Sequence, residues 1–334
     1  MLTALPHNTS VGRIWTNALQ RLAQTEHLVV REPTSRGWRG VDVWLTDGHQ
    51  GPLPVREPVV AHLHEAAWAD PHLRPTFDPS FLARYEGPSD AAARRAAAIL
   101  TVSASSRDQI CAAYGVAPER VVVAHNGIDH AVYRPDGPDA RPAIGAAGGD
   151  PDRPYVLYVS TLHPRKNLAA LRGAMEQLAA EGRPEALVLV AGPAADRADQ
   201  AELATAAVAP IAGRAVVNLA GAGDDVVAGL LRGAAAFCLP SLMEGFGMSV
   251  AEALASATPV VVSDRGSLPA VVGDSGVVCE PSTPAVAAAL GTVLTDPALA
   301  SRLRERGPVR AAAFTWDAMV ARWRFALDLA TGRA

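Results

Sequence analysis

The segment 240–254 constrains the fold of this chain more than any other part of the sequence. It follows a short apolar run at 234–239 that is typical of a buried strand, and it continues into apolar residues spaced as in a helix. Gly245 and Gly247 lie between the two, where they allow backbone conformations that other residues avoid. The segment therefore predicts a strand, a tight turn and the start of a helix.

The same turn carries the residues of a ligand site. A helix that begins there offers free N–H groups and the positive end of its dipole, which suit an anion such as a phosphate. Glu244 stands just before the turn, and Glu252 follows about two helical turns later. Because carboxylates repel phosphates, we expect their partners to be the hydroxyls of a ribose or a sugar ring. The pattern predicts a nucleotide-sugar site.

Length and charge narrow the classes of protein. A chain of 334 residues is long enough for two domains that each bury a core. The net charge of −4 gives no basic surface for nucleic acid, and the first 134 residues carry as many acidic residues as arginines. Neither a secretion signal nor an apolar run of ~20 residues is present, so we expect a cytoplasmic protein. Peripheral contact with a membrane through a local basic patch stays open.

Of the 30 basic residues only Lys166 is a lysine. Arginine and lysine are not interchangeable where a compact ammonium contacts a phosphate, so its retention indicates a specific role. The alternative is that Lys166 was retained by chance on a solvated helix and has no specific role. Arg165 and Lys166 follow an apolar run, beginning at Tyr155, that is typical of a strand. Two adjacent cations at the carboxyl end of a parallel strand are hard to explain as core, and they suit an anionic ligand such as a phosphate.

The first half of the chain also alternates between strand and helix patterns. Strand-like runs lie at 2–5, 28–30, 41–45, 59–63 and 121–124. His62 and His64 share one side of the fourth run, and His64 stands at its carboxyl end, where open α/β sheets bind ligands. For His64 a contact with a bound ligand and a plain hydrogen bond to a backbone carbonyl are both open, whereas we expect His62 to be structural.

Aromatic residues gather in the segment 68–85, which we expect to form a loop or short helices. Trp68, Phe77 and Tyr85 would there stack on sugar rings or on an apolar acceptor, or form core beneath a loop. A Pro-, Gly- and Ala-rich segment at 135–154 predicts an interdomain linker. Further strand-like runs follow at 187–191, 216–219, 259–263 and 276–279. The chain then ends in a predicted helix that Thr315 or Asp317 would cap.

Several of these segments resemble glycosyltransferase family 4, whose members are retaining enzymes of the GT-B fold. The E-x7-E motif of that family is matched without a gap by Pro240, Glu244, Gly245, Phe246, Gly247, Glu252 and Ala253. The Pro-Arg-Lys-Asn element at 164–167, the Asn-Gly-Ile-Asp element at 126–129 and the Phe-Thr-Trp element at 314–316 match as well. The resemblance covers about residues 6–329.

The resemblance implies two Rossmann-like β/α/β domains that face each other across a cleft. The first would comprise residues 1–134 together with a C-terminal helix at 315–334 that crosses back to it. Residues 135–154 would be the linker, and residues 155–314 the domain that binds the nucleotide sugar.

The implied function is retaining transfer of a hexosyl group from an NDP-α-sugar, either GDP-mannose or a UDP-sugar. The acceptor would be a hydroxyl of a saccharide, a lipid-linked molecule or a natural product. Similar proteins need no divalent ion, so neither a metal nor another cofactor is expected. Two alternatives remain: a non-catalytic subunit that binds nucleotide sugars, and a GT-B phosphorylase or epimerase.

The resemblance also assigns residues to roles. Four are implied to be catalytic: His64, Arg165, Lys166 and Glu244. The donor would be bound by Gly12, Ser103, Asn126, Gly221, Gly245, Phe246, Gly247, Met248 and Glu252. Trp68, Phe77 and Tyr85 are the candidates for acceptor contacts.

Overall fold

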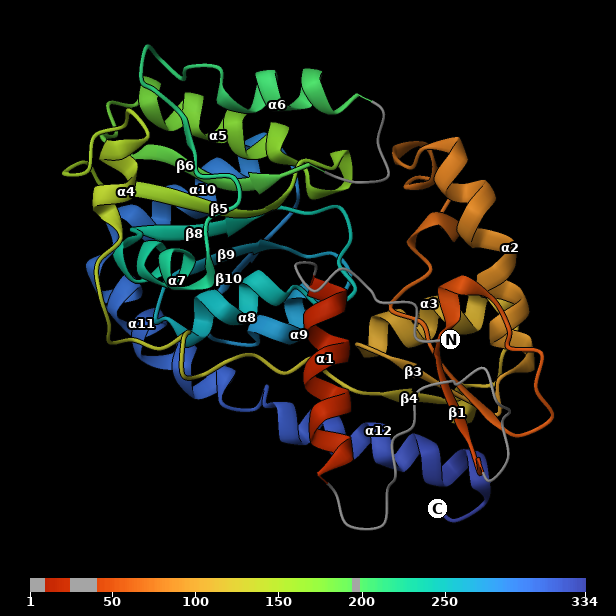
Figure 1. Ribbon diagram of the computed structural model, residues 1–334. Helices are drawn as coiled ribbons and strands as arrows, with labels where there is room; N and C mark the ends of the chain where they lie inside the picture. Colours follow the sequence, from red (N-terminus) through yellow and green to blue (C-terminus); the bar gives the residue numbers. More distant parts are fainter. Residues whose placement is uncertain (1–9, 25–40, 194–198) are drawn as a thin grey trace. The chain divides into compact units, whose positions relative to one another are not determined.

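A computed structural model describes residues 10–24, 41–193 and 199–334. The chain divides into two compact units (Figure 1). Unit 1 comprises residues 1–127 and 314–334, and unit 2 comprises residues 128–313. The strands predicted at 2–5 and 28–30 lie outside the described residues.

Unit 1 contains a parallel sheet in which the described strands have the order β1-β2-β3-β4. The strands are β1 (Trp44–Asp47), β2 (Val59–His62), β3 (Ala98–Thr101) and β4 (Val121–Val123). The α-helices are α1 (Ser10–Ala23), α2 (Pro79–Arg95), α3 (Ala104–Tyr114) and α12 (Trp316–Thr331). Short 3-10 helices are η1 (Gly48–Gln50), η2 (Ala67–Ala69), η3 (Arg74–Thr76) and η4 (Pro118–Arg120).

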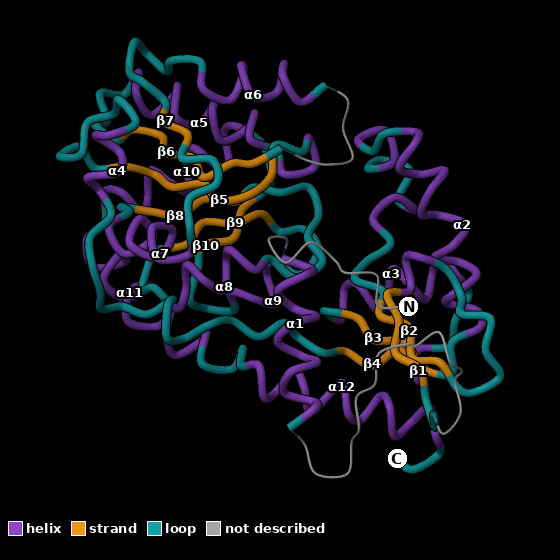
Figure 2. The backbone as a smooth tube through the Cα atoms, viewed as in Figure 1, coloured by secondary structure: helices purple, strands orange, loops and turns teal. Residues whose placement is uncertain are grey.

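Helices cover both faces of this sheet, because successive residues of each strand point to opposite sides. Val60 and Leu100 pack with α1 and α12 on one face, whereas Ala61 and Ile99 pack with α2 and α3 on the other. The C-terminal helix thus belongs to unit 1, as predicted (Figure 2). Thr315 caps it by accepting a hydrogen bond from the backbone N–H of Ala318, at 3.1 Å.

In the described residues of unit 2 six strands form a parallel sheet with the order β10-β9-β8-β5-β6-β7. The strands are β5 (Tyr155–Thr161), β6 (Ala186–Gly192), β7 (Val217–Asn218), β8 (Ala236–Leu239), β9 (Val260–Ser263) and β10 (Val277–Cys279). The helices are α4 (Arg141–Ala146), η5 (Pro164–Lys166), α5 (Leu168–Ala180), α6 (Gln200–Val208), α7 (Asp224–Gly233), α8 (Met248–Ala255), α9 (Leu268–Val272), α10 (Thr283–Thr295) and α11 (Pro297–Ala311).

The order of these strands creates a topological switch point. From β5 the chain proceeds through β6 to β7 toward one edge of the sheet, and it then returns to β8 and proceeds through β9 to β10 toward the other edge. The carboxyl ends of β5 and β8 therefore flank the position where doubly wound sheets bind ligands. Both loops that the sequence singled out, 162–167 and 240–247, leave the sheet at this position.

The residues predicted as a linker, 135–154, lie within unit 2. They contain α4, which packs against α7 and buries Ile144. The division between the units falls after Gly127, within the Asn-Gly-Ile-Asp element. The Pro-, Gly- and Ala-rich composition of this segment led to the prediction of a linker, because composition does not show the buried Ile144 that anchors it to unit 2.

Candidate functional site

The loop after β5 is tied directly to the loop after β8. The side-chain amide of Asn167 donates to the carbonyls of Pro240, at 3.0 Å, and Pro281, at 2.8 Å. The backbone N–H of Leu242 donates to the carbonyl of Arg165 at 2.8 Å. These bonds hold the Pro-Arg-Lys-Asn element beside the segment that contains Glu244.

Three of the four predicted catalytic residues meet at this place. The ammonium of Lys166 lies 2.7 Å from both carboxylate oxygens of Glu244. Arg165 Nη1 lies 3.8 Å from Glu244 Oε2 and donates to the carbonyl of Met243 at 2.8 Å. The hydroxyl of Ser241 donates to Glu244 Oε1 at 2.7 Å. From the sequence, the cations were expected to bind a phosphate and Glu244 to bind hydroxyls. The ion pair between them was not predicted.

The charge of this cluster follows from the environment of Glu244, which is 5% exposed. Burial alone would raise the pKa of this carboxyl group, but the charges of Lys166 and Arg165, with hydrogen bonds from Lys166 and Ser241, outweigh it and lower the pKa. The carboxylate is therefore ionised at neutral pH. Two cations and one carboxylate leave the cluster with a net positive charge.

The glycine turn completes the cluster with a helix N-terminus. Gly247 has a φ of +91° and stands at the N-cap position of α8, where, as a glycine, it has no side chain to make a capping hydrogen bond. The positive end of the helix dipole is thus available to an anion. Ser267 fixes the turn, because its hydroxyl donates to the carbonyls of Glu244 at 3.1 Å and Phe246 at 2.8 Å.

Replacing Gly266 with alanine is expected to destabilise the protein by about 2–4 kcal/mol. Gly266 has a φ of +60°, and a Cβ there would lie 2.5 Å from the carbonyl oxygen of Glu244. Urea unfolding followed by circular dichroism measures the loss. Gly182→Ala is the matched control, because its φ is +82° and no described atom lies within 4 Å of the new Cβ. Equal losses for both variants would contradict the close packing of the two turns.

The other predicted donor-binding residues of unit 2 differ in exposure. Glu252 and Phe246 are buried, at 4% and 3% exposed. Met248 is half-buried in the first turn of α8. Gly221 is exposed, in the loop between β7 and α7.

In unit 1 the predicted donor-binding residues all lie at helix or strand ends. Gly12 lies in the first turn of α1. The hydroxyl of Ser103 caps α3 by accepting the backbone N–H of Ser106 at 3.0 Å. Asn126 follows β4, is 3% exposed, and its side-chain oxygen has no hydrogen-bond partner in the described part of the chain. Buried polar atoms are normally hydrogen-bonded, so the side-chain oxygen of Asn126 is a candidate to accept a hydrogen bond from a ligand.

His64 lies two residues beyond β2, within a cluster of three histidines. His62 is 1% exposed and packs against Trp15 and Trp323, which agrees with its predicted structural role. The ring of His64 lies 4.2 Å from that of His62 and 6.2 Å from that of His49, measured between ring centroids. Sequence analysis missed His49. Its position could have revealed it, since it follows β1 as His64 follows β2.

Burial lowers the pKa of all three imidazoles. For His49 the loss of hydration lowers the pKa to about 4. For His64 burial and the neighbouring His49 lower the pKa to about 4, against an opposing effect of the Asp47 carboxylate. Burial, with His64 and His49 nearby, places the pKa of His62 well below its usual value. The cluster is therefore neutral at physiological pH.

The aromatic residues form one contiguous chain of ring contacts. Trp68 and Phe77 are 4% and 6% exposed, so the structure favours the core alternative for both. Phe81 stacks on Phe77 with ring centroids 5.6 Å apart and contacts Tyr85 at 4.7 Å. Tyr85, on the half-buried face of α2, is the one acceptor candidate of the three whose ring remains partly exposed.

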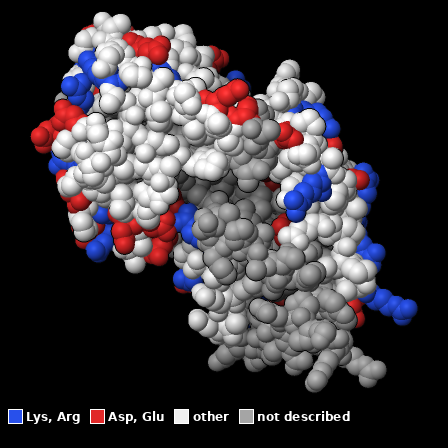
Figure 3. Space-filling view, turned by 45° about the horizontal axis from the view of Figure 1, so that its top comes forward, with Lys and Arg blue, Asp and Glu red and all other residues white. Residues whose placement is uncertain are grey.

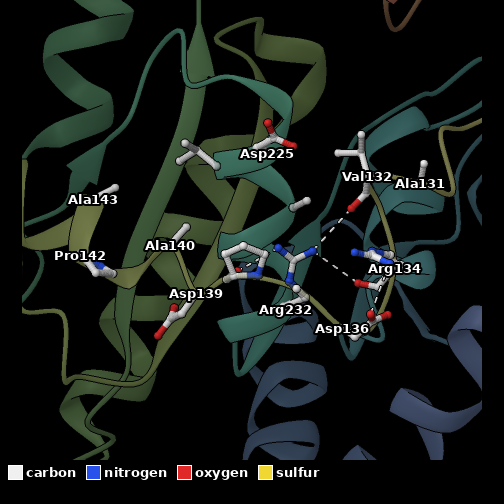
Figure 4. Close-up of a pocket in the computed structure, with 14 residues that line it drawn as sticks. Ala131, Val132, Arg134, Asp136, Asp139, Ala140, Pro142, Ala143, Asp225 and Arg232 are labelled. Atoms are coloured by element: carbon white, nitrogen blue, oxygen red, sulfur yellow. Dashed lines mark hydrogen bonds and ion pairs between the residues drawn. The ribbon is translucent and has the colours of Figure 1, made fainter.

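A pocket of about 580 Å³ lies elsewhere on unit 2, between the segment 131–143 and α7 (Figure 4). Arg232 borders it and donates to the carbonyl of Pro138 at 2.9 Å and to that of Val132 at 3.5 Å. None of the predicted site residues lines this pocket, so it is separate from the candidate site.

On the face drawn in Figure 3, basic and acidic side chains of the described residues are interspersed without a continuous basic area. No described helix combines the length and apolar character that crossing a membrane requires. In residues 10–24, 41–193 and 199–334, no group of three or more His, Cys, Asp or Glu side chains, the histidine cluster included, is arranged so that it could hold a metal ion.

Comparison with known proteins decides the family. The model for glycosyl transferases group 1 matches residues 143–310, and that for Glycosyltransferase Family 4 matches residues 41–132. D-inositol 3-phosphate glycosyltransferase 1 of Catenulispora acidiphila is 31% identical over 306 residues, which are 87% of this chain and 72% of that protein. The chain belongs to glycosyltransferase family 4.

Other relatives are matched over a smaller share of their length. MMP alpha-(1->4)-mannosyltransferase of Mycolicibacterium hassiacum is 32% identical over 234 residues, or 69% of this chain. The match spans 53% of that protein, so this chain covers about half of it. Among solved structures, Anabaena Alr3699/HepE in complex with UDP-glucose has a TM-score of 0.69 and 21% identity, over 82% of this chain and 72% of that chain. This likeness shows the GT-B fold.

Proposed function

We propose that this chain is a retaining glycosyltransferase that moves a hexosyl group from an NDP-α-sugar to a hydroxyl of a saccharide, lipid-linked or natural-product acceptor. The observation that carries the proposal is the cluster of Arg165, Lys166 and Glu244 beside the N-terminus of α8, at the switch point of the unit 2 sheet. A net positive cluster suits a diphosphate, and its carboxylate suits sugar hydroxyls. Relatives that are named as glycosyltransferases support the same activity.

In the proposed reaction the bond between the anomeric carbon and the β-phosphate oxygen breaks, and negative charge builds on that oxygen. Arg165, Lys166 and the N-terminus of α8 stabilise this charge. The acceptor oxygen attacks the same face of the sugar and gives its proton to the leaving phosphate, so the anomeric configuration is retained. Glu244 would hold sugar hydroxyls, Glu252 the ribose hydroxyls, and His64 the transferred sugar. No divalent ion is required in this scheme.

A thermal-shift titration with UDP, GDP, ADP and dTDP tests donor binding first. A ligand that binds only the folded protein stabilises it by about 2.7 kcal/mol at a hundredfold excess over Kd. GDP-mannose and UDP-glucose are then incubated with acceptor panels, with and without EDTA, and the anomeric configuration of the product is determined by NMR. Transfer with retention supports the proposal. Nucleotide binding without transfer or donor hydrolysis would favour a non-catalytic subunit.

Replacing Glu252 with glutamine is expected to weaken binding of the preferred nucleoside diphosphate about tenfold or more, because a charged hydrogen bond to a ribose hydroxyl is lost. Isothermal titration calorimetry measures the change. The matched control is the 2′,3′-dideoxy nucleotide, which lacks those hydroxyls and should bind the wild type and the variant equally. A variant that binds the ordinary nucleotide as tightly as the wild type would exclude the ribose contact.

A further inference from the structure

Both backbone polar groups of His64 are held by side chains rather than by the sheet. The strand β2 ends at His62, and the N–H of His64 donates to His49 Nε2 at 3.2 Å. Its carbonyl accepts a hydrogen bond from the hydroxyl of Thr101 at 3.1 Å. Because β1 and β2 are parallel neighbours with Asp47 paired to His62, the residues that follow the two strands emerge side by side.

These contacts fix the protonation state of His49. A backbone N–H can only donate, so Nε2 of His49 must present its lone pair, and the proton of the neutral ring lies on Nδ1. Nδ1 lies 2.9 Å from the hydroxyl of Ser89, a buried residue of α2, which accepts that proton's hydrogen bond. His49 is thus hydrogen-bonded through both ring nitrogens. These two bonds fix the orientation of the ring and select one tautomer.

The ring of His49 is also held by packing. It lies nearly parallel to the ring of His64, with an interplanar angle of 17°, and edge-on to Trp68 at 5.4 Å. Its backbone N–H donates to the carboxylate of Asp47 at 3.1 Å. The Nε2 atom of His64 is buried and has no partner in the described part of the chain, so the orientation of His64 depends on these neighbours.

We propose that His49 is a positioning residue for His64, which it holds through the hydrogen bond from the His64 backbone N–H and the packing of the two rings. This inference rests on the proposed role of His64 in glycosyl transfer. In this proposal His49 contacts His64 and not the substrate. It acts by keeping the imidazole of His64 in one place.

The test combines activity with two readouts that need no substrate. In His49→Leu we expect kcat to fall about 10- to 100-fold, a range typical of misplaced catalytic groups, while the Kd of the nucleoside diphosphate stays unchanged. His49→Gln, whose amide oxygen can accept the same hydrogen bond, should recover most of kcat. In a His64→Ala background, His49→Leu should have no further effect, because the two residues act as one unit. His72→Asn, at an exposed position of unit 1, is the control.

Hydrogen exchange and imidazole ¹⁵N NMR test the contact in the intact protein, whatever its activity. We expect the Nδ1–H tautomer for His49, and faster exchange of the His64 amide in His49→Leu than in the wild type. An Nε2–H tautomer, or unchanged exchange, would overturn the inference even if transfer is observed. Additive losses of kcat in the double variant would also overturn it. If the wild type transfers no sugar, the proposed function fails by itself, and the NMR and exchange results still decide the contact.

Discussion

Replacing Lys166 with methionine is expected to reduce turnover about 100- to 1,000-fold and to destabilise the protein by about 3 kcal/mol. The methionine fills a similar volume but removes the ammonium that lies 2.7 Å from both oxygens of Glu244. Glu244 would then remain buried with Arg165 at 3.8 Å as its nearest cation. The diphosphate would lose one of its two cationic side chains at the same time.

The loss of stability should depend on pH in a defined direction. In the wild type the lowered pKa of Glu244 gives a stabilisation that is present above the usual carboxyl pKa and is lost as the pH falls through the lowered value. Without Lys166, burial dominates and raises that pKa, so Glu244 takes up a proton on folding. The stability deficit of Lys166→Met should therefore be larger at pH 8 than at pH 5. Urea unfolding at both values measures it.

A double variant separates the two effects. Lys166→Met combined with Glu244→Leu removes both charges, so we expect the stability to return and the activity to stay lost. Lys166→Arg keeps the charge and is the matched control for stability. Wild-type turnover in Lys166→Met, with unchanged affinity for the diphosphate, would exclude the proposed role. A stable Lys166→Met protein at pH 8 would show instead that Glu244 finds another partner.

The local geometry of this site could be predicted from the sequence, but the ion pair between Lys166 and Glu244 could not. The apolar run before residue 240 and the glycines after it were enough for the strand, the turn and the start of α8. Lys166 and Glu244 meet because β8 is hydrogen-bonded to β5. Strand order is a property of the whole sheet, and neither hydrophobic period nor turn residues specify it.

His49 escaped prediction for a related reason. The apolar pattern placed the first described strand at 41–45, whereas β1 spans Trp44–Asp47. Thr46 and Asp47 are polar, so hydropathy alone ended the strand too early and left His49 in an undefined loop. Pairing with β2 extends the strand to Asp47, because the register matches Asp47 to His62. The aromatic segment shows the same limit, since Trp68 and Phe77 both pack against Phe81 of α2, a contact that hydropathy alone does not specify.

Acidification is expected to destabilise unit 1 in particular. His49 and His64 have pKa values of about 4 when folded, against about 6.5 in an unfolded chain, and the pKa of His62 is lowered further. Their folded pKa values lie below the unfolded ones, so the stabilisation is fully present above about pH 6.5 and is lost as the pH falls toward 4. At pH 5 the loss amounts to about 2 kcal/mol for each of His49 and His64.

Tryptophan fluorescence can follow this loss in unit 1 alone, because all six tryptophans of the chain fall within its residues. Urea titrations between pH 7.5 and pH 5 should show a falling midpoint by fluorescence. Asp47 opposes the effect only in part, since its carboxylate raises the pKa of His64 without offsetting burial. His72→Asn, at an exposed position of unit 1, is the control variant, and its midpoint should also fall. A fluorescence midpoint that stays constant over this range would mean that the three imidazoles are hydrated in the folded protein. It would then contradict both their burial and the single tautomer inferred for His49.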